Sequence, residues 1–151
     1  LWRGRFVGKS SPVHFWWGSF DLACTRFNGE RAPEHPGGIP HLGDWVTREA
    51  YSHACISAGW WPGTAGGLAE PAFYAYAYPE PEGLADAEIG PAAARYDHDL
   101  SEFVLPYEAV RTAADPDAAL LEFLDSSYAA AAELAGWDRA ALERPAAAPG
   151  G

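Results

Sequence analysis

The 151-residue chain contains no methionine, only one lysine (Lys9), and no long apolar run. Because a native start would supply a methionine, we expect the chain to be a piece of a longer protein. No segment approaches the roughly 18 consecutive apolar residues of a membrane helix, and no apolar stretch of the signal-peptide type follows Arg3 and Arg5. We therefore expect a cytoplasmic protein with no membrane partner.

Cysteine is also scarce, and the common catalytic motifs are missing. Cys24 and Cys55 are the only cysteines, and their spacing fits neither a metal motif nor a disulfide framework, so each is expected to be a small buried hydrophobic residue. The chain has no GxSxG, P-loop, GxGxxG, HExxH or CxxC motif. The five histidines form no close pair at ligand spacing: His14, His35, His41, His53 and His98. The sequence thus predicts no metal site and no cofactor.

Positive charge is scarce in the second part of the chain. Residues 1–60 carry six basic and five acidic residues, whereas residues 61–151 carry four basic and sixteen acidic residues, giving the net charge of −11. Such a surface repels phosphate backbones, so we expect no nucleic-acid partner. A solvated acidic surface that aids solubility accounts for this charge.

The hydrophobic patterning predicts an α+β fold in which a mostly antiparallel sheet carries C-terminal helices on one face. One domain is expected over residues 1–143, followed by a disordered tail over 144–151, where proline, glycine and alanine cannot pack a core. Residues 28–44 are expected to form a long loop. The expected strands cover 12–27, 51–61, 72–78 and 101–105, and the expected helices cover 107–113, 116–135 and 138–143.

Residues 12–27 are expected to be extended, with successive side chains pointing to alternate faces and apolar residues on both faces. This favours a central strand that is covered on both sides. Gly18, in its middle, suggests a bulge.

A long helix is expected to begin at Asp115-Pro116, because an acidic cap followed by proline is a strong start signal. Leu120, Leu124 and Tyr128 then form one apolar stripe that should pack on the sheet.

The candidate catalytic residues are His14, Asp21 and His53. The two histidines lie in aromatic strands, where a buried imidazole needs a partner. Ser19 and Asp21 fall on the same strand face and, with a histidine from a neighbouring strand, would resemble a nucleophile–base–acid set. The alternative is that each histidine is satisfied within the core and that Asp21 pairs with an arginine.

Aromatic residues suggest a ligand-binding surface, since 21 of the 151 residues are Phe, Trp or Tyr. Rings with polar edges suit stacking on a sugar or another planar ligand. The alternative is a purely structural aromatic core. The candidate ligand-binding residues are Trp16, Trp17, Arg26, Trp60, Tyr74 and Tyr76.

Four blocks resemble, in the same order, a bacterial family of uncharacterised proteins known as domain of unknown function 5996. They are SPVHFWWGSFDLACTRF (11–27), REAYSHACISAGWWPG (48–63), PAFYAYAYPEPEG (71–83) and the segment 102–143. Members of that family are about twice as long, with a preceding half rich in strands, so the resemblance implies that this chain is the carboxy-terminal half. It implies no activity and no catalytic residue. The chain departs from the family at Ala54, where the family's Tyr-Ser-His block continues with Glu.

Three functions therefore stand as hypotheses. The first is a small-molecule-binding domain with a cleft lined by aromatic residues and histidine. The second is a cofactor-independent hydrolase or isomerase that uses a His/Asp pair. The third is a structural or assembly domain that contacts a missing N-terminal half or another copy of itself.

Overall fold

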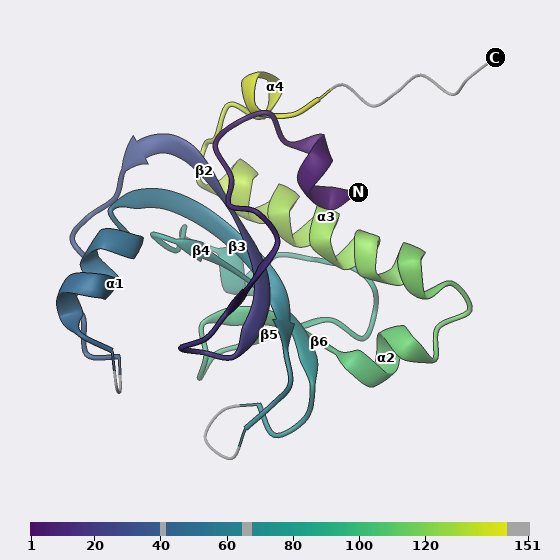
Figure 1. The fold of residues 1–151 in the computed structure, drawn as a ribbon. Coiled ribbons are helices and arrows are strands. Elements are labelled where there is room, and N and C mark those ends of the chain that lie inside the picture. The colour runs from purple at the N-terminus through teal and green to yellow at the C-terminus, as the bar shows by residue number, and fades with distance from the viewer. Residues whose placement is uncertain (40–41, 65–67, 145–151) are drawn as a thin grey trace.

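The computed structural model describes residues 1–39, 42–64 and 68–144 (Figure 1). The predicted tail over 144–151 lies, beyond residue 144, outside the described residues. In chain order the elements are η1 (Trp2–Arg5), β1 (His14–Trp16), β2 (Asp21–Arg31), α1 (Asp44–Ala50), β3 (His53–Trp61), β4 (Ala72–Tyr78), η2 (Leu84–Asp86), β5 (Arg95–Asp97), β6 (Glu102–Pro106), α2 (Tyr107–Arg111), α3 (Pro116–Leu134) and α4 (Arg139–Leu142).

The six strands form one sheet in the order β1-β2-β3-β4-β6-β5, and every neighbouring pair is antiparallel. Three strands expected from the sequence match β3, β4 and β6 closely, and the expected helices match α2, α3 and α4. The predicted α+β fold with C-terminal helices is confirmed. None of the helices among the described residues is long and apolar enough to cross a membrane.

The segment 12–27 is a hairpin and not one central strand. The chain turns at residues 17–20, where Phe20 adopts a left-handed conformation with φ 60°. Trp16 then lies opposite Asp21, and His14 lies opposite Ala23. Alternation read across a tight turn is misleading, because both arms continue the same apolar pattern. The predicted loop over 28–44 is also too long, since β2 continues to Arg31.

Helix α3 has a capping residue and a proline at its start and a glycine just after its end. The Asp115 carboxylate accepts a hydrogen bond from the backbone N–H of Ala118 at 3.0 Å, and Pro116 occupies the first turn. The chain leaves the helix through Gly136 at φ 67°. These signals explain why the helix boundaries could be predicted from sequence.

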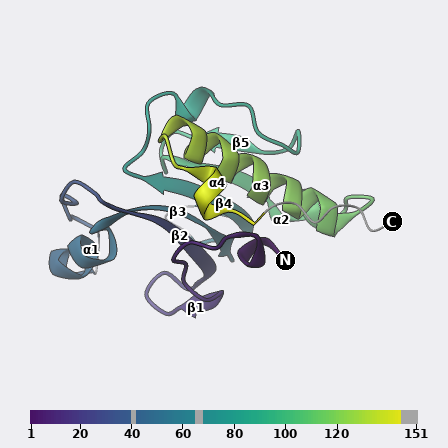
Figure 2. The ribbon, with the colours of Figure 1, turned by 90° about the horizontal axis from the view of Figure 1, so that it is seen from above.

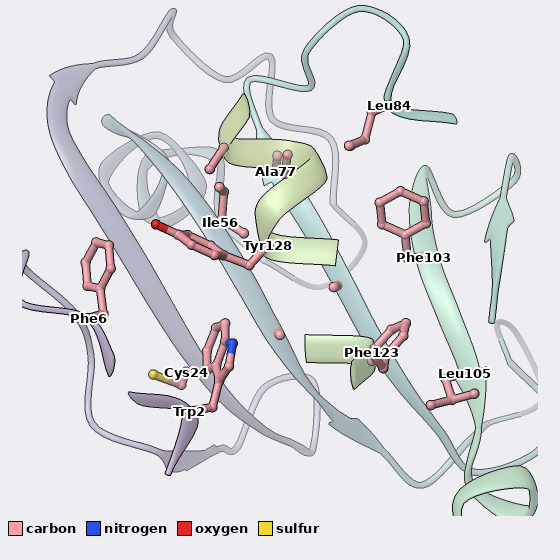
Figure 3. Packing of buried hydrophobic residues seen from close by; sticks show 14 of the residues in the cluster. Trp2, Phe6, Cys24, Ile56, Ala77, Leu84, Phe103, Leu105, Phe123 and Tyr128 are labelled. Atoms are coloured by element: carbon pink, nitrogen blue, oxygen red, sulfur yellow. The ribbon is translucent and has the colours of Figure 1, made fainter. Parts of the chain in front are cut away.

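The core lies between α3 and one face of the sheet (Figures 2 and 3). Ala75 and Ala77 on β4 are buried there, and their small side chains leave room for Phe123 and Tyr128 of the helix. The apolar stripe of α3 is therefore centred on Phe123, which the sequence analysis had not included. Leu120 and Leu124 pack at its margin, half-buried.

Candidate functional site

The sheet has two unlike faces, and alternation assigns each residue to one of them. Cys24, Ala58 and Ala75 lie in register and face the α3 core, so their neighbours Ala23, Gly59 and Tyr74 face the opposite side. We call that opposite side the polar face. Its members of interest are His14, Trp16, Asp21, Thr25, Ser57, Tyr74, Tyr76 and Glu102.

Asp21 is a buried carboxylate of the polar face that two hydroxyl groups hydrogen-bond. It is only 6% exposed, and its carboxylate accepts hydrogen bonds from the hydroxyls of Ser19 and Tyr74. The two hydroxyls satisfy the desolvated carboxylate, which would otherwise be costly to bury. Burial and the bond to Asp21 raise the pKa of Tyr74 well above its ordinary value, so its phenol remains protonated as a donor.

Gly59 makes the Tyr74–Asp21 bond geometrically feasible. Tyr74 is on β4 and Asp21 begins β2, so the phenol must cross β3 between them. A Cβ atom on Gly59 would lie 2.5 Å from the Leu22 carbonyl oxygen, 2.7 Å from the Tyr74 hydroxyl and 2.9 Å from the Cβ of Ala23. The absence of a side chain at this position therefore opens the path of the tyrosine.

A second tyrosine continues the polar face beside Tyr74. The rings of Tyr74 and Tyr76 are stacked, with centroids 6.2 Å apart and planes 13° apart. The Tyr76 hydroxyl lies 3.0 Å from that of Tyr51, which follows α1. Burial raises the pKa of Tyr76, and neighbouring Tyr51 adds to the effect. His35 stacks on Tyr51 with centroids 4.9 Å apart, which places the chain around His35 beside this face.

Glu102 is the acidic residue of the polar face that lacks a partner. Glu102 lies opposite Asp97 in the pairing of β5 with β6. In the pairing of β4 with β6, Ala75 lies opposite Phe103, so the register brings Glu102 beside Tyr76. No hydrogen bond or ion pair joins its carboxyl to any other residue that the structure describes. Desolvation, with smaller contributions from Asp97 and Asp21, raises the pKa of Glu102 to about 7.

His14 and Trp16 form the aromatic edge of the polar face. Their ring centroids are 4.3 Å apart, and the indole is 42% exposed. The Nε2 atom of His14 is buried without a hydrogen-bond partner among the described residues. The turn beyond them is held by Trp61, whose indole N–H donates to the Ser19 carbonyl at 3.0 Å.

His53 does not join His14 and Asp21. It lies opposite Arg31, whereas Asp21 adjoins the other end of β3, at Trp61. Eight residues of strand separate those positions, or roughly 26 Å at the usual rise. The His53 ring instead lies beside its neighbour, with Nδ1 3.1 Å from the Ser52 hydroxyl.

Three of the predicted ligand-binding residues lie away from the polar face. Trp17 is 83% exposed on the hairpin turn. Trp60 faces the α3 side, between Leu22 and Phe73. Arg26 also faces that side, where it is buried.

Arg26 is enclosed by aromatic rings in the core. Its guanidinium carbon lies 3.6 Å from the ring centroid of Trp2 and 4.3 Å from that of Tyr128. It donates to the Trp2 carbonyl at 2.6 Å. Burial lowers its pKa from the ordinary value. These contacts make Arg26 the residue that fastens η1 to the core.

The family model described as a family of unknown function, DUF5996, matches residues 1–144. The chain belongs to this family. Comparison with curated proteins and with solved structures found no match. Ala54, the position at which the resemblance expects Glu, is buried on the opposite side of β3 from His53 in this DUF5996 chain.

Sequence reasoning missed Glu102, Tyr51 and Gly59 as parts of the site of this DUF5996 chain. Alternation within 101–105 does place Glu102 and Val104 on one face. The register between β4 and β6, which brings that face beside the tyrosines, cannot be read from either strand alone. Among the described residues, no group of three or more His, Cys, Asp or Glu side chains could hold a metal ion.

Proposed function

We propose that this DUF5996 chain is a small-molecule-binding domain whose ligand, a small organic cation, contacts the polar face. The supporting observation is that two carboxyls, Asp21 and Glu102, share a face with stacked aromatic rings. Neither carboxyl has an arginine, lysine or histidine partner within the described ranges. Burial, with smaller contributions from Asp97 and Asp21, raises the pKa of Glu102, and a cation beside it would offset that effect.

The aromatic residues suit the same ligand. The half-exposed indole of Trp16 offers a face that attracts a cation, and the unpaired Glu102 carboxyl provides a charge-assisted hydrogen bond. A protonated amine beside Glu102 would favour its ionised form, so binding should release a proton near pH 7.

The experiment is a thermal-shift and calorimetric titration at pH 7.5 with choline, agmatine and spermidine, using inositol as a neutral comparison. We expect at least one amine, and not inositol, to raise the melting temperature in a concentration-dependent manner. Glu102→Gln should abolish the shift. Glu88→Gln, at an exposed loop position, is the matched control and should leave it unchanged. Equal shifts in wild type and Glu102→Gln would contradict the proposal.

The alternative of an enzyme with a His/Asp pair has less support. Asp21 accepts from Ser19 and Tyr74, and no imidazole is among its partners in the described part of the chain. Ser19 donates to Asp21 directly, without an intervening histidine that could act as its base.

An assembly role is favoured by one specific observation, the exposed apolar residues of the hairpin. Val13, Trp17 and Phe20 are each more than half exposed, and Phe15 packs edge-on against both rings. Such a cluster is typical of interaction surfaces. Sedimentation of the chain and of Trp17→Ser/Phe20→Ser would test it, because self-association should disappear in the double variant.

We also infer a bacterial, cytoplasmic protein without a nucleic-acid partner. The family resemblance supports the bacterial source. The two free and buried thiols, Cys24 and Cys55, support a reducing compartment, and the acidic surface disfavours nucleic acid. Cell fractionation and a gel-shift assay would test these inferences.

A further inference from the structure

A hollow of about 350 Å³ lies on the α3 side of the sheet, opposite the polar face. Its walls come from η1 and α3, and its floor comes from β2, β3 and β4. Figure 3 shows Trp2 and Cys24, which belong to this lining, side by side near the helix. Arg3, Ala58, Trp60 and Asp117 also belong to the lining, together with three leucines of α3.

The hollow follows from the sizes of the side chains around it. Cys24 and Ala58 lie in register on the floor, and both are small. Leu120, Leu121 and Leu124 of α3 lie above them and are only half-buried, so this side of the core is partly open. Phe123 and Tyr128 fill the other end of the core, whereas Trp2, Trp60 and Phe73 line the hollow at this end.

One buried polar atom in the lining has no partner. The indole N–H of Trp60 is buried and makes no hydrogen bond to any described residue. The other lining indole differs, since Trp2 donates to the Leu124 carbonyl at 3.1 Å. Leaving a buried donor unpaired costs about 1–3 kcal/mol, so a ligand acceptor that meets this N–H after a small shift of the indole would recover that cost.

The charges around the hollow favour a neutral occupant. Arg3 and Asp117 are the two residues of opposite charge in its lining, and they offset each other. The Arg3 Nε also donates to the Ser11 carbonyl at 2.9 Å. Cys24 adds no charge, because its pKa is raised by burial.

We propose that this hollow binds a neutral, mainly apolar small molecule of one or two rings that presents one hydrogen-bond acceptor to Trp60. Its volume lies at the lower end of the usual range for small-molecule pockets, which limits the ligand to that size. The site is separate from the polar face, because the sheet lies between them, and it does not depend on the function proposed above.

The test compares two probes of nearly the same shape, 2-acetylnaphthalene and 2-isopropenylnaphthalene. Only the first has an acceptor, so we expect it to bind about tenfold more tightly, with a shift of the Trp60 indole N–H resonance in protein NMR. Trp60→Phe should remove that preference, so that the two probes bind the variant with similar affinity. Trp17→Phe, on the exposed turn, is the control and should retain the tenfold difference.

A second variant keeps the proposal falsifiable if Trp60→Phe folds poorly. Leu121→Trp would fill the hollow from its half-buried wall and should abolish binding of both probes without loss of folding. The proposal is overturned if neither probe shifts the Trp60 resonance at its solubility limit, or if Leu121→Trp binds as well as wild type. It is also overturned if the hollow is occupied by a second copy, seen as a dimer in sedimentation that Leu121→Trp abolishes.

Discussion

The Tyr74 hydroxyl crosses β3 above Gly59 to donate its hydrogen bond to the Asp21 carboxylate. One bond thereby links the first residue of β2 to the middle of β4, two strands away. It holds the hairpin turn as well, because Ser19 donates to the same carboxylate. The order of the polar face depends on this arrangement.

Gly59→Ala should destabilise the fold by about 1–3 kcal/mol, because the added methyl group would collide with the Leu22 carbonyl oxygen, the Tyr74 hydroxyl and Ala23. Urea unfolding monitored by circular dichroism measures the loss. Gly4→Ala is the control, since a Cβ there meets nothing within 4 Å. Equal stability of the two variants would show that both the β2 backbone at Leu22 and the tyrosine can move aside at no cost.

Tyr74→Phe should cost about 1–3 kcal/mol in unfolding free energy, because it leaves a buried carboxylate with one donor fewer. Tyr96→Phe is the matched control. It removes an exposed bond to Glu80 at 2.8 Å and should change stability by much less. The idea fails if Asp21→Asn and Tyr74→Phe are additive in a double-mutant cycle, because coupled groups are non-additive.

Glu102 should make the fold less stable as pH rises. Its pKa is raised from 4.5 to about 7 in the folded chain, so folding favours the protonated form. This contribution is fully present below pH 4.5 and is lost as pH rises through 7, by about 3 kcal/mol in all. Glu102→Gln should therefore flatten the stability profile between pH 5 and 8, as measured by urea unfolding. A profile identical to that of wild type would exclude this role.

Arg26→Met should loosen the N-terminal segment, because η1 is held by the guanidinium through the Trp2 ring and carbonyl. We expect a loss of about 2 kcal/mol or more, and faster proteolysis within residues 1–10. Arg95→Met removes an exposed arginine of the edge strand and should have little effect on either measurement. Unchanged proteolysis in Arg26→Met would mean that the aromatic contacts alone hold η1.

Local signals explain which parts of the fold the sequence could predict. The Asp115-Pro116 start and the alternating tyrosines of β4 depend on neighbouring residues, and both elements were found close to their observed bounds. The hairpin at 14–31 was missed, because its turn carries Trp17 and Phe20 in place of the usual Asn-Gly pair. Phe20 in a left-handed conformation cannot be anticipated from residue type.

The candidate site was predictable only in part, because it depends on how neighbouring strands are paired. Tyr74 and Tyr76 share one face, as alternation within their strand suggests. His14, Trp16 and Asp21 lie on that face too, but continuous alternation through 12–27 predicts Asp21 on the face opposite to the other two, and the hairpin turn makes that prediction wrong. Alternation does not give the register between strands or the distance along them. His53 therefore lies on the polar face but at the end of β3 that is distant from Asp21. Arg26 and Trp60 lie on the opposite face of the sheet.

The two margins of the sheet have a consequence for how copies of this chain could meet. On one margin, residues 9–11 and β1 cover most of β2, and the uncovered end carries Glu30 and Arg31. On the other margin, β5 has three residues, of which Arg95 and Asp97 are charged. Short, charged margins discourage the addition of a further strand from another molecule. Fibril-like growth by strand addition is therefore disfavoured, and association between copies would have to use a face of the sheet or the hairpin turn.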